Sequence, residues 1–316
     1  MSGRHVSARD EHPPAEVIAV FGPTASGKSV VSEATAARLE TEVVSVDALQ
    51  VYRGLPILTN QPAGTTRLVG IRSPTEQMTV GEFAPLAHAE IDAVVAQRGV
   101  AVVTGGTGLY LRAALAELDV PPVVDDTTMD RIEREIDRDP GVAHARLAEL
   151  DPAAALAVHP NDRQRLSRAL ALAESGASLA RADDRLWGVE TRRPTLVVGL
   201  VLPAEELDRR IRERAQRMFD AGVVEEVRAA LEQPLSRTVE KALGLREIAT
   251  LDATEALERL VTRTRRYARY QQKWMRRIPG IVLVDGGRRV SAIADEIVDV
   301  ARKSCTGDEN TVSTGG

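Results

Sequence analysis

The sequence has very little cysteine, few aromatic residues and no long apolar run. Its one cysteine among 316 residues, Cys305, excludes an internal disulfide and a cysteine-rich zinc site, and it favours a reducing compartment. The five histidines show no metal-ligand spacing, so no zinc site is predicted. The apolar runs are only as long as strands, and the first residues lack the apolar core of a signal peptide. We therefore expect a cytoplasmic protein with no membrane span.

Composition narrows the class of protein further. Aromatic residues make up only 3% of the chain (three Phe, four Tyr and two Trp), so a local cluster of them stands out. A content of 43% hydrophobic and 28% charged residues excludes a mainly disordered, collagen-like or coiled-coil chain. The net charge of −5 gives no sign of a nucleic-acid partner. The distribution of the basic residues along the chain does indicate one, as described below. The length predicts about two domains, or one with a large insertion.

Apolar runs alternate with helical patterns along most of the chain. Strands are predicted at 17–21, 42–46, 100–103, 195–202 and 281–284, and this alternation favours a doubly wound parallel α/β sheet of the phosphate-loop type. Residues 126–190 show only short helical patterns of mixed charge. We expect a core domain formed by 16–122 and 191–304, a helical insertion at 123–190, a disordered leader at 1–15 and a disordered tail at 305–316.

A phosphate-binding motif lies between the first strand and a helix. Residues 22–29 fit G-x-x-x-x-G-K-[ST], with the members Gly22, Pro23, Thr24, Ala25, Ser26, Gly27, Lys28 and Ser29. The backbone N–H groups of such a loop and the start of the following helix form an anion site. Lys28 adds a point charge, and the Ser29 hydroxyl can hold Mg²⁺. The motif therefore predicts a phosphate or pyrophosphate site.

The motif does not say which phosphate compound binds. A typical phosphate-loop nucleoside triphosphatase needs a second carboxylate for Mg²⁺ at the end of an apolar strand, but strand 100–103 runs into Thr-Gly-Gly-Thr. Asp47, after strand 42–46, could hold the metal, or it could be free for another task. Kinase-like chemistry and other chemistry both stay open at this point.

Asp47 and Thr107 are expected at the same edge of the sheet as the phosphate loop, because the carboxyl ends of parallel strands meet there. A carboxylate in that place can accept a proton from a nucleophile, and the Thr107 hydroxyl can orient a second reactant. The alternative is that Asp47 caps a following helix and that the glycines before Thr107 form only a tight turn.

Residues 259–277 are basic and aromatic. They hold eight Lys or Arg residues and no acidic one, and Tyr267, Tyr270 and Trp274 share a helical face at spacing i, i+3, i+7. Such a stretch suits a nucleic-acid backbone. Alternatively, the aromatic residues pack the helix onto the sheet and the arginines are a solvated face.

Two further arginine pairs stand at helical spacing. Arg165 and Arg168 lie in the helical insertion, on one face of a predicted helix. Arg210 and Arg214 lie four residues apart and could reach over bound phosphates as a cationic clamp.

Taken together, these residues resemble the tRNA dimethylallyltransferases, also called tRNA isopentenyltransferases. The resemblance runs from about residue 17 to residue 285. Six blocks stand in the family's order: GPTASGKS (22–29), SVDALQVYRG (45–54), GGTGLYLRA (105–113), HPNDRQRLSRAL (159–170), L-x-x-R-I-x-x-R-x-x-x-M (207–218) and RYARYQQKWMRR (266–277).

The resemblance implies a reaction. A dimethylallyl group would pass from dimethylallyl diphosphate to N6 of adenosine 37, which lies 3′ of the tRNA anticodon, and pyrophosphate would leave. The phosphate loop would bind the diphosphate, with Mg²⁺ assisted by Ser29. Arg214 would stabilise the charge of the leaving group, Asp47 would accept the N6 proton, and Thr107 would contact the base or the diphosphate. The base would flip out of the anticodon stack.

The resemblance also implies partners. The helical insertion would clamp the anticodon stem–loop. Apart from the resemblance, nothing in the sequence demands more than a monomer, so a monomer is expected. The expected tRNA contacts are Asp47, Ala48, Leu49, Gln50, Thr107, Gln164, Arg165, Leu166, Ser167, Arg168, Lys241, Ala242, Leu243, Gly244, Leu245 and Arg246.

The chain departs from the family pattern in two places. Gln61 stands where related sequences usually carry a lysine, and Thr66 and Arg67 stand where they carry two histidines. Leu245 replaces a frequent tyrosine.

Three other functions stay open. An adenylate isopentenyltransferase would prenylate a free nucleotide, which needs no helical clamp. A small-molecule kinase would consume ATP, which leaves the basic stretch unexplained. A non-catalytic RNA-binding protein would keep its function after Asp47→Asn, whereas an enzyme would lose most of its rate.

Overall fold

The computed structural model describes residues 15–118, 122, 124–180 and 188–303. The tail expected at 305–316, Cys305 within it, and the leader expected at 1–15, apart from Ala15, lie outside the described residues. The chain divides into two compact units. The first comprises Met1–Met78, Glu82–Glu117 and Val189–Gly316, and the second comprises Thr79–Gly81 and Leu118–Gly188.

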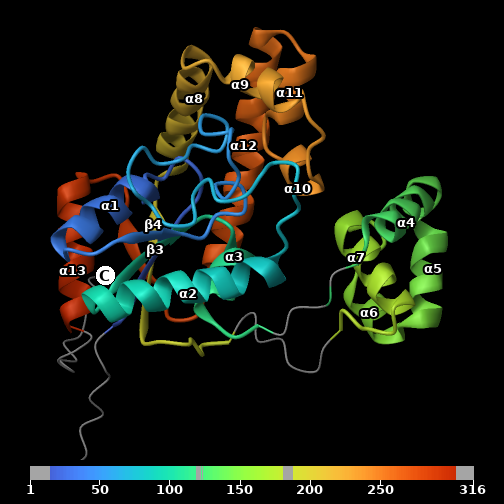
Figure 1. Ribbon diagram of the computed structural model, residues 1–316, viewed down its shortest axis with the longest axis horizontal. Coiled ribbons are helices and arrows are strands. Elements are labelled where there is room, and N and C mark those ends of the chain that lie inside the picture. Colours follow the sequence, from blue (N-terminus) through green and yellow to red (C-terminus); the bar gives the residue numbers. More distant parts are fainter. Residues whose placement is uncertain (1–14, 119–121, 123, 181–187, 304–316) are drawn as a thin grey trace, which may run out of the picture. The chain divides into compact units, whose positions relative to one another are not determined.

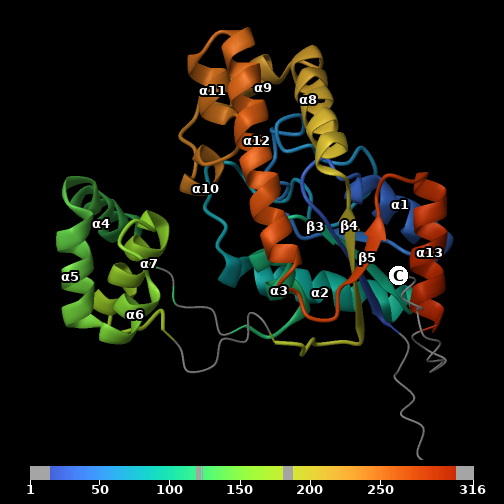
Figure 2. The ribbon, with the colours of Figure 1, turned by 180° about the vertical axis from the view of Figure 1, so that it is seen from behind.

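The first unit is built on a five-stranded parallel sheet (Figures 1 and 2). In the order of the sheet, the strands are β2 (Val43–Ser45), β3 (Ala101–Gly105), β1 (Val17–Phe21), β4 (Thr195–Val201) and β5 (Val282–Asp285). Strand β1 lies in the centre, and its last residue, Phe21, is in register with Gly105 on one side and Gly199 on the other. The end of β1 therefore lies beside the end of β3 on one side, while β4 continues to Val201 on the other.

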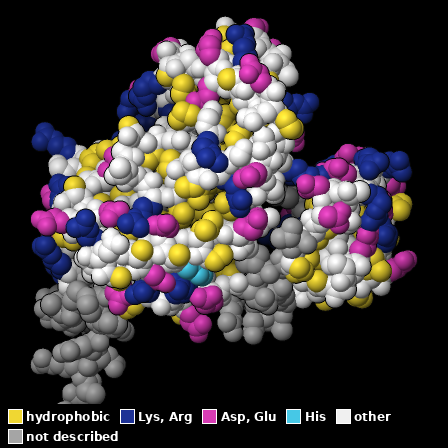
Figure 3. Space-filling view, in the orientation of Figure 1, with side chains coloured by type: hydrophobic (Ala, Val, Ile, Leu, Met, Phe, Trp, Pro, Cys, Tyr) yellow, Lys and Arg dark blue, Asp and Glu magenta, His cyan; other side chains and the backbone are white. Residues whose placement is uncertain are grey.

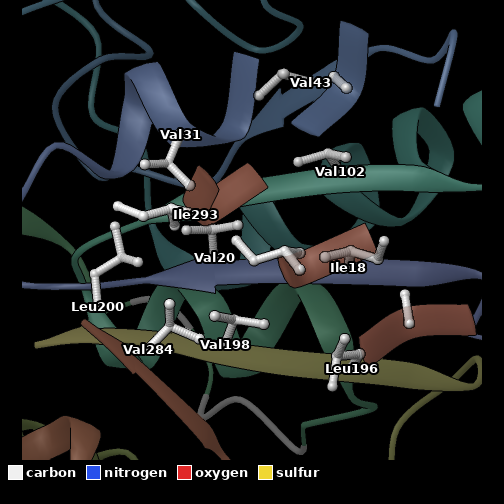
Figure 4. Packing of buried hydrophobic residues seen from close by; sticks show 13 residues of the cluster. Ile18, Val20, Val31, Val43, Val102, Leu196, Val198, Leu200, Val284 and Ile293 are labelled. Atoms are coloured by element: carbon white, nitrogen blue, oxygen red, sulfur yellow. The ribbon is translucent and has the colours of Figure 1, made fainter. Parts of the chain in front are cut away.

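Helices α1 (Lys28–Arg38) and α13 (Val290–Lys303) cover one face of this sheet. Figure 4 shows Ile18, Val20 and Val198 of the strands packed with Val31 of α1 and Ile293 of α13. Alternate strand residues point to this face, and all five residues of β1 are buried, as expected for a strand covered on both sides.

The opposite face of the sheet receives α3 (Gly108–Leu115) and the end of α12 (Ala253–Met275). A Cβ on Gly199 of β4 would lie 3.0 Å from the sulfur of Met275, so this glycine allows the helix to approach the sheet. Phe83 of α2 (Val80–Arg98) contacts Tyr110 of α3, with ring centroids 4.9 Å apart. Helices on both faces confirm the predicted doubly wound α/β fold.

A group of helices extends beyond the carboxyl ends of the strands (Figures 1 and 2). It consists of α8 (Ala204–Asp220), α9 (Val223–Ala230), α10 (Arg237–Glu240), α11 (Leu245–Thr250) and the first turns of α12. Leu207, Ile211 and Met218 form the buried stripe of α8, which packs along α12. The sequence pattern over 240–250 is helical, but the structure does not form one continuous helix there. The chain turns at Gly244, whose φ of +93° lies in the left-handed region that favours glycine.

The second unit is helical. Its elements are α4 (Asp126–Arg138), α5 (Pro140–Leu150), α6 (Pro152–Ala157) and α7 (Arg163–Glu174). Each helix is preceded by an aspartate whose side chain accepts a hydrogen bond from a first-turn N–H group, the aspartates being Asp125, Asp139, Asp151 and Asp162.

Charged side chains cover the outside of the second unit. Basic and acidic residues are interspersed there in Figure 3, and Arg146 bridges Glu135 and Glu174 at 2.7 and 2.5 Å. No helix formed by the described residues has the length and apolar character needed to cross a membrane.

Candidate active site

The phosphate loop follows directly from β1. Gly27, with φ +89°, begins α1, and Ala25 also takes a positive φ of +65°. A Cβ on Gly22 would lie 2.6 Å from the Ser26 hydroxyl oxygen, so the first glycine lets the loop fold back on itself. That Ser26 hydroxyl is buried and has no hydrogen-bond partner among the described residues. A buried orphan donor at this place suits an anion.

Lys28 and Arg214 bring two enclosed positive charges to this loop. Burial lowers the pKa of Lys28 to about 8, an effect that Asp47 opposes and Arg214 reinforces. Burial also lowers the pKa of Arg214, whose guanidinium donates to the Thr24 hydroxyl while its Nε has no partner among the described residues. Neither cation forms an ion pair within the described part of the chain. Such charges require an anionic ligand for their compensation.

Asp47 follows β2 at the same edge of the sheet. Its carboxylate accepts a hydrogen bond of 3.0 Å from the N–H group of Leu49, and it acts electrostatically on both Lys28 and Arg214. The helix that Asp47 was alternatively expected to cap does not exist, because the next helix in the described chain is α2, which begins at Val80. The Asp47 carboxylate therefore stabilises the turn at Leu49 by a hydrogen bond, and its negative charge acts on Lys28 and Arg214.

Thr107 ends the glycine turn after β3 and precedes α3. Its hydroxyl lies 3.2 Å from the hydroxyl of Tyr267 on α12. Burial and the charge of Asp47 raise the pKa of Tyr267 to about 12, so the phenol stays protonated and can donate. A Cβ on Gly108 would lie 2.1 Å from the Trp274 ring, which explains why this turn carries glycine. Two of the three predicted aromatic residues of α12 thus lie at the site.

Gln271 is a site residue that the sequence analysis did not identify. Its side chain is buried, its Oε1 accepts from the Thr24 N–H at 2.7 Å, and its Nε2 donates to the Gly106 carbonyl at 2.8 Å. An uncharged amide one turn after Tyr267, in an otherwise basic stretch, was the signal available in the sequence.

An apolar cavity of about 40 Å³ adjoins Arg214 and Thr24 of the phosphate loop. Thr24 and Arg214 form its polar side, and α8 and α12 supply apolar walls that include Ile211, Met218 and Leu260. The same site therefore offers positive charge and apolar surface side by side.

Arg210, the other half of the predicted clamp, also reaches the loop but with a different partner. Its Nε donates to Glu206 at 2.6 Å, and its Nη1 donates to the Ser26 carbonyl at 3.4 Å. Arg214 alone of the pair is left without a carboxylate among the described residues.

The expected RNA contacts divide by exposure. Lys241, Arg246, Gln164 and Arg165 are exposed and Arg168 is partly exposed, whereas the side chains that pack inside are Gln50, Leu166, Ser167, Ala242 and Leu245. Asp47, Ala48, Leu49 and Thr107 are partly exposed, Leu243 lines the cavity and Gly244 forms the turn before α11.

The residues that depart from the family pattern have structural partners. Gln61 donates to the Tyr52 carbonyl at 2.6 Å, and thereby holds the loop that follows Asp47. Gln50 fixes the same loop by donating to the Asn60 carbonyl at 2.8 Å. Arg67 forms ion pairs with Glu42 and Glu90 at 2.8 and 2.6 Å.

The outer face of α12 carries exposed positive charge. Arg266, Arg269, Lys273 and Arg276 are exposed and form no ion pair within the described ranges. Tyr270 is 53% exposed beside them and stacks on Tyr267 with centroids 6.5 Å apart, so it does not pack onto the sheet as the alternative interpretation required.

A metal ion would find few protein ligands here. The described residues contain no group of three or more His, Cys, Asp or Glu side chains that could hold one. The Ser29 hydroxyl in the first turn of α1 is a hard oxygen donor, and so is the Asp47 carboxylate, which acts electrostatically on the neighbouring Lys28. This donor set fits Mg²⁺, which takes most of its ligands from phosphates and water.

Together, the fold and the site define an α/β protein of the phosphate-loop class with an enclosed cationic site. The model of the IPP transferase family matches residues 50–278. The chain is 38% identical to the tRNA dimethylallyltransferase of Thermobifida fusca, over 93% of this chain and 99% of that protein. It is 39% identical to the tRNA dimethylallyltransferase of Streptomyces coelicolor, over 87% and 92%. The chain belongs to the IPP transferase family and is a prenyltransferase enzyme.

Solved structures agree with this assignment. The tRNA isopentenylpyrophosphate transferase of Bacillus halodurans superposes with a TM-score of 0.64 at 27% identity, covering 92% of this chain and 98% of that one. A eukaryotic dimethylallyltransferase, in a study of its action on tRNA, gives a TM-score of 0.69 at 26% identity, covering 86% of this chain and 74% of that one.

Proposed function

We propose that this chain transfers the dimethylallyl group of dimethylallyl diphosphate to N6 of adenosine 37 in tRNA, releasing pyrophosphate. The observation that carries the proposal is the pairing of two enclosed cations, Lys28 and Arg214, with an apolar cavity at the same loop. An anionic head and a short alkyl tail are the two parts of an allylic diphosphate. The names of the relatives support the acceptor, since each is a transferase that acts on tRNA.

The diphosphate binds to the loop formed by residues 22–29, and Lys28 and Arg214 face it. As N6 attacks C1 of the dimethylallyl group, the N–C bond forms, the C1–O bond breaks and its electrons pass to the diphosphate. The two cations stabilise this growing charge, most strongly because they are shielded from water. Asp47 accepts the proton that N6 loses.

Mg²⁺ is part of the proposal, with the Ser29 hydroxyl as its protein ligand. When bound, it supplies additional charge neutralisation to the diphosphate. The enclosed cations remain the protein's own contribution to the departure of pyrophosphate.

Recognition of the RNA uses the acceptor side of the site. Thr107, supported by Tyr267, contacts the flipped adenine, and the exposed basic face of α12 contacts the phosphate backbone. The stem–loop contacts come from the exposed or partly exposed members of the two expected segments: Gln164, Arg165, Arg168, Lys241 and Arg246. A tRNA substrate agrees with the expectation of a cytoplasmic protein, and the site needs no second copy of the chain to be complete.

A transfer experiment separates this function from its competitors. The protein, Mg²⁺ and dimethylallyl diphosphate labelled in the alkyl group are incubated with an unmodified tRNA and, separately, with AMP. Label in the tRNA supports the proposal, and label only in AMP indicates an adenylate isopentenyltransferase. Label in neither, together with ATP consumption, indicates a kinase, which Thr104 in place of a carboxylate at the end of β3 already disfavours.

A further inference from the structure

In the proposed reaction one loop binds the diphosphate and another contacts the acceptor. The sheet connects these two loops only where they leave their strands. The diphosphate loop leaves β1 after Phe21, and the acceptor loop, Gly105–Thr107, ends β3. The last paired residues of the two strands are Phe21 and Gly105. Beyond this pair no backbone hydrogen bond connects the two loops in the described chain.

Gln271 supplies the connection that the backbone lacks. Its carboxamide accepts from the N–H of Thr24 at 2.7 Å and donates to the carbonyl of Gly106 at 2.8 Å. A carboxamide has the same kinds of donor and acceptor as a peptide bond. Gln271 therefore bridges the two loops just beyond the point where the hydrogen bonding between β1 and β3 ends. Its partners are 247 and 165 residues away in the sequence.

The Gln271 bridge lies close to two residues of the proposed reaction, Lys28 and Thr107. A Cβ on Gly106 would be 2.5 Å from Nε2 of Gln271 and 3.2 Å from Nζ of Lys28. Gly106 is therefore enclosed between the amide and the ammonium group, and Thr107, the next residue, lies against Tyr267. Any shift at Gly106 changes both the surroundings of the cation and the place of Thr107.

We infer that Gln271 is a positioning residue that fixes the separation between the diphosphate loop and the acceptor loop. The inference rests on the proposed function. Each loop keeps its own ligand groups without Gln271, so each substrate still binds. What is lost is their mutual alignment, and a displacement of about 1 Å can lower the rate of the chemical step about 100-fold.

Three variants test this inference in steady-state transfer assays with wild-type protein alongside. Gln271→Met keeps the size of the side chain and removes the two hydrogen bonds to the loops, so kcat is expected to fall about 100-fold while each KM changes less than about threefold. Gln271→Glu keeps the acceptor but adds a negative charge near the diphosphate, so the KM for dimethylallyl diphosphate is expected to rise as well. Gln272→Met, at the next and partly exposed position, is the control and is expected to match the wild type.

Binding of inorganic pyrophosphate, measured by calorimetry, separates alignment from folding. Gln271→Met is expected to bind pyrophosphate like the wild type. The inference is wrong if this variant binds pyrophosphate normally and keeps the wild-type kcat, or if its defect lies in KM or in pyrophosphate affinity alone. If the wild type itself transfers no label to tRNA, the proposed function fails and the inference fails with it.

Discussion

Lys28→Met is expected to stabilise the ligand-free protein while it abolishes transfer. The Lys28 residue keeps some accessible surface, but its ammonium group is enclosed, and burial lowers its pKa from an ordinary value of 10.5 to about 8. A shift of this size corresponds to an upper limit of about 3 kcal/mol for keeping the charge in the folded state. Methionine has a similar length and no charge, so the free energy of unfolding at pH 7 should rise by about 1–3 kcal/mol.

The effect should depend on pH in a defined direction. Lys28 binds its proton with a pKa of about 8 in the folded protein and 10.5 when unfolded, so the unfolded chain holds more protons between these values. The Lys28 contribution therefore makes the wild type more stable as pH rises through this range, and the advantage of Lys28→Met disappears there.

Urea denaturation at pH 7 and at pH 10, with and without pyrophosphate, measures these quantities. Pyrophosphate at 100 times its Kd should raise the free energy of unfolding of the wild type by about 2.7 kcal/mol and have little effect on the variant. Lys241→Met removes an exposed lysine and is the control, expected within about 0.5 kcal/mol of the wild type. If Lys28→Met is less stable than the wild type, or if pyrophosphate stabilises the wild type and Lys28→Met equally, then Lys28 is not an enclosed cation that binds the diphosphate.

Three further predictions concern catalysis and specificity. Asp47→Asn should lower kcat for transfer by about 10²–10⁴-fold because the N6 proton loses its acceptor, and calorimetry should still detect pyrophosphate binding; an unchanged kcat would exclude Asp47 as the base. Met218→Ala enlarges the apolar cavity. The ratio of kcat/KM for a ten-carbon allylic diphosphate to kcat/KM for the five-carbon one should therefore rise at least about tenfold. An unchanged ratio would mean that the alkyl group does not bind in this cavity. The double change Arg266→Glu and Arg269→Glu should raise the KM for tRNA about tenfold and weaken its salt dependence, while Arg228→Glu on α9 should not; equal effects of both variants would argue against the α12 surface.

The fold was largely predictable because its strands are short, fully apolar and separated by clear turn residues. The predicted strands at 17–21 and 195–202 match β1 and β4 to within a residue. The interruption at Gly244 was not predictable from the local pattern, because its surroundings come from residues distant in the sequence: a Cβ there would lie 2.9 Å from Leu260 Cδ1 and 3.4 Å from Leu58 Cδ1.

The parts of the site that follow strands were also predictable. The phosphate loop, Asp47 and Thr107 are placed by their positions at strand ends. In contrast, the role of Gln271 depends on the approach of α12 to two loops more than 160 residues away, which no local pattern encodes. The expected RNA contacts at 164–168 and 241–246 were too broad, because the family resemblance points to whole segments and does not distinguish exposed from buried residues. In the structure Gln164 and Lys241 are exposed, whereas Leu166 and Leu245 are buried.

Transfer to N6 of adenosine 37 is checked by finding which nucleoside of the tRNA carries the dimethylallyl group. Two tRNA transcripts that differ only in having adenosine or guanosine at position 37 are incubated with the protein, Mg²⁺ and labelled dimethylallyl diphosphate, and the labelled nucleoside is identified after digestion. Label is expected in the adenosine 37 transcript, as N6-dimethylallyladenosine, and none is expected in the guanosine 37 transcript. Equal labelling of both transcripts, or label on any other nucleoside, would contradict transfer to N6 of adenosine 37.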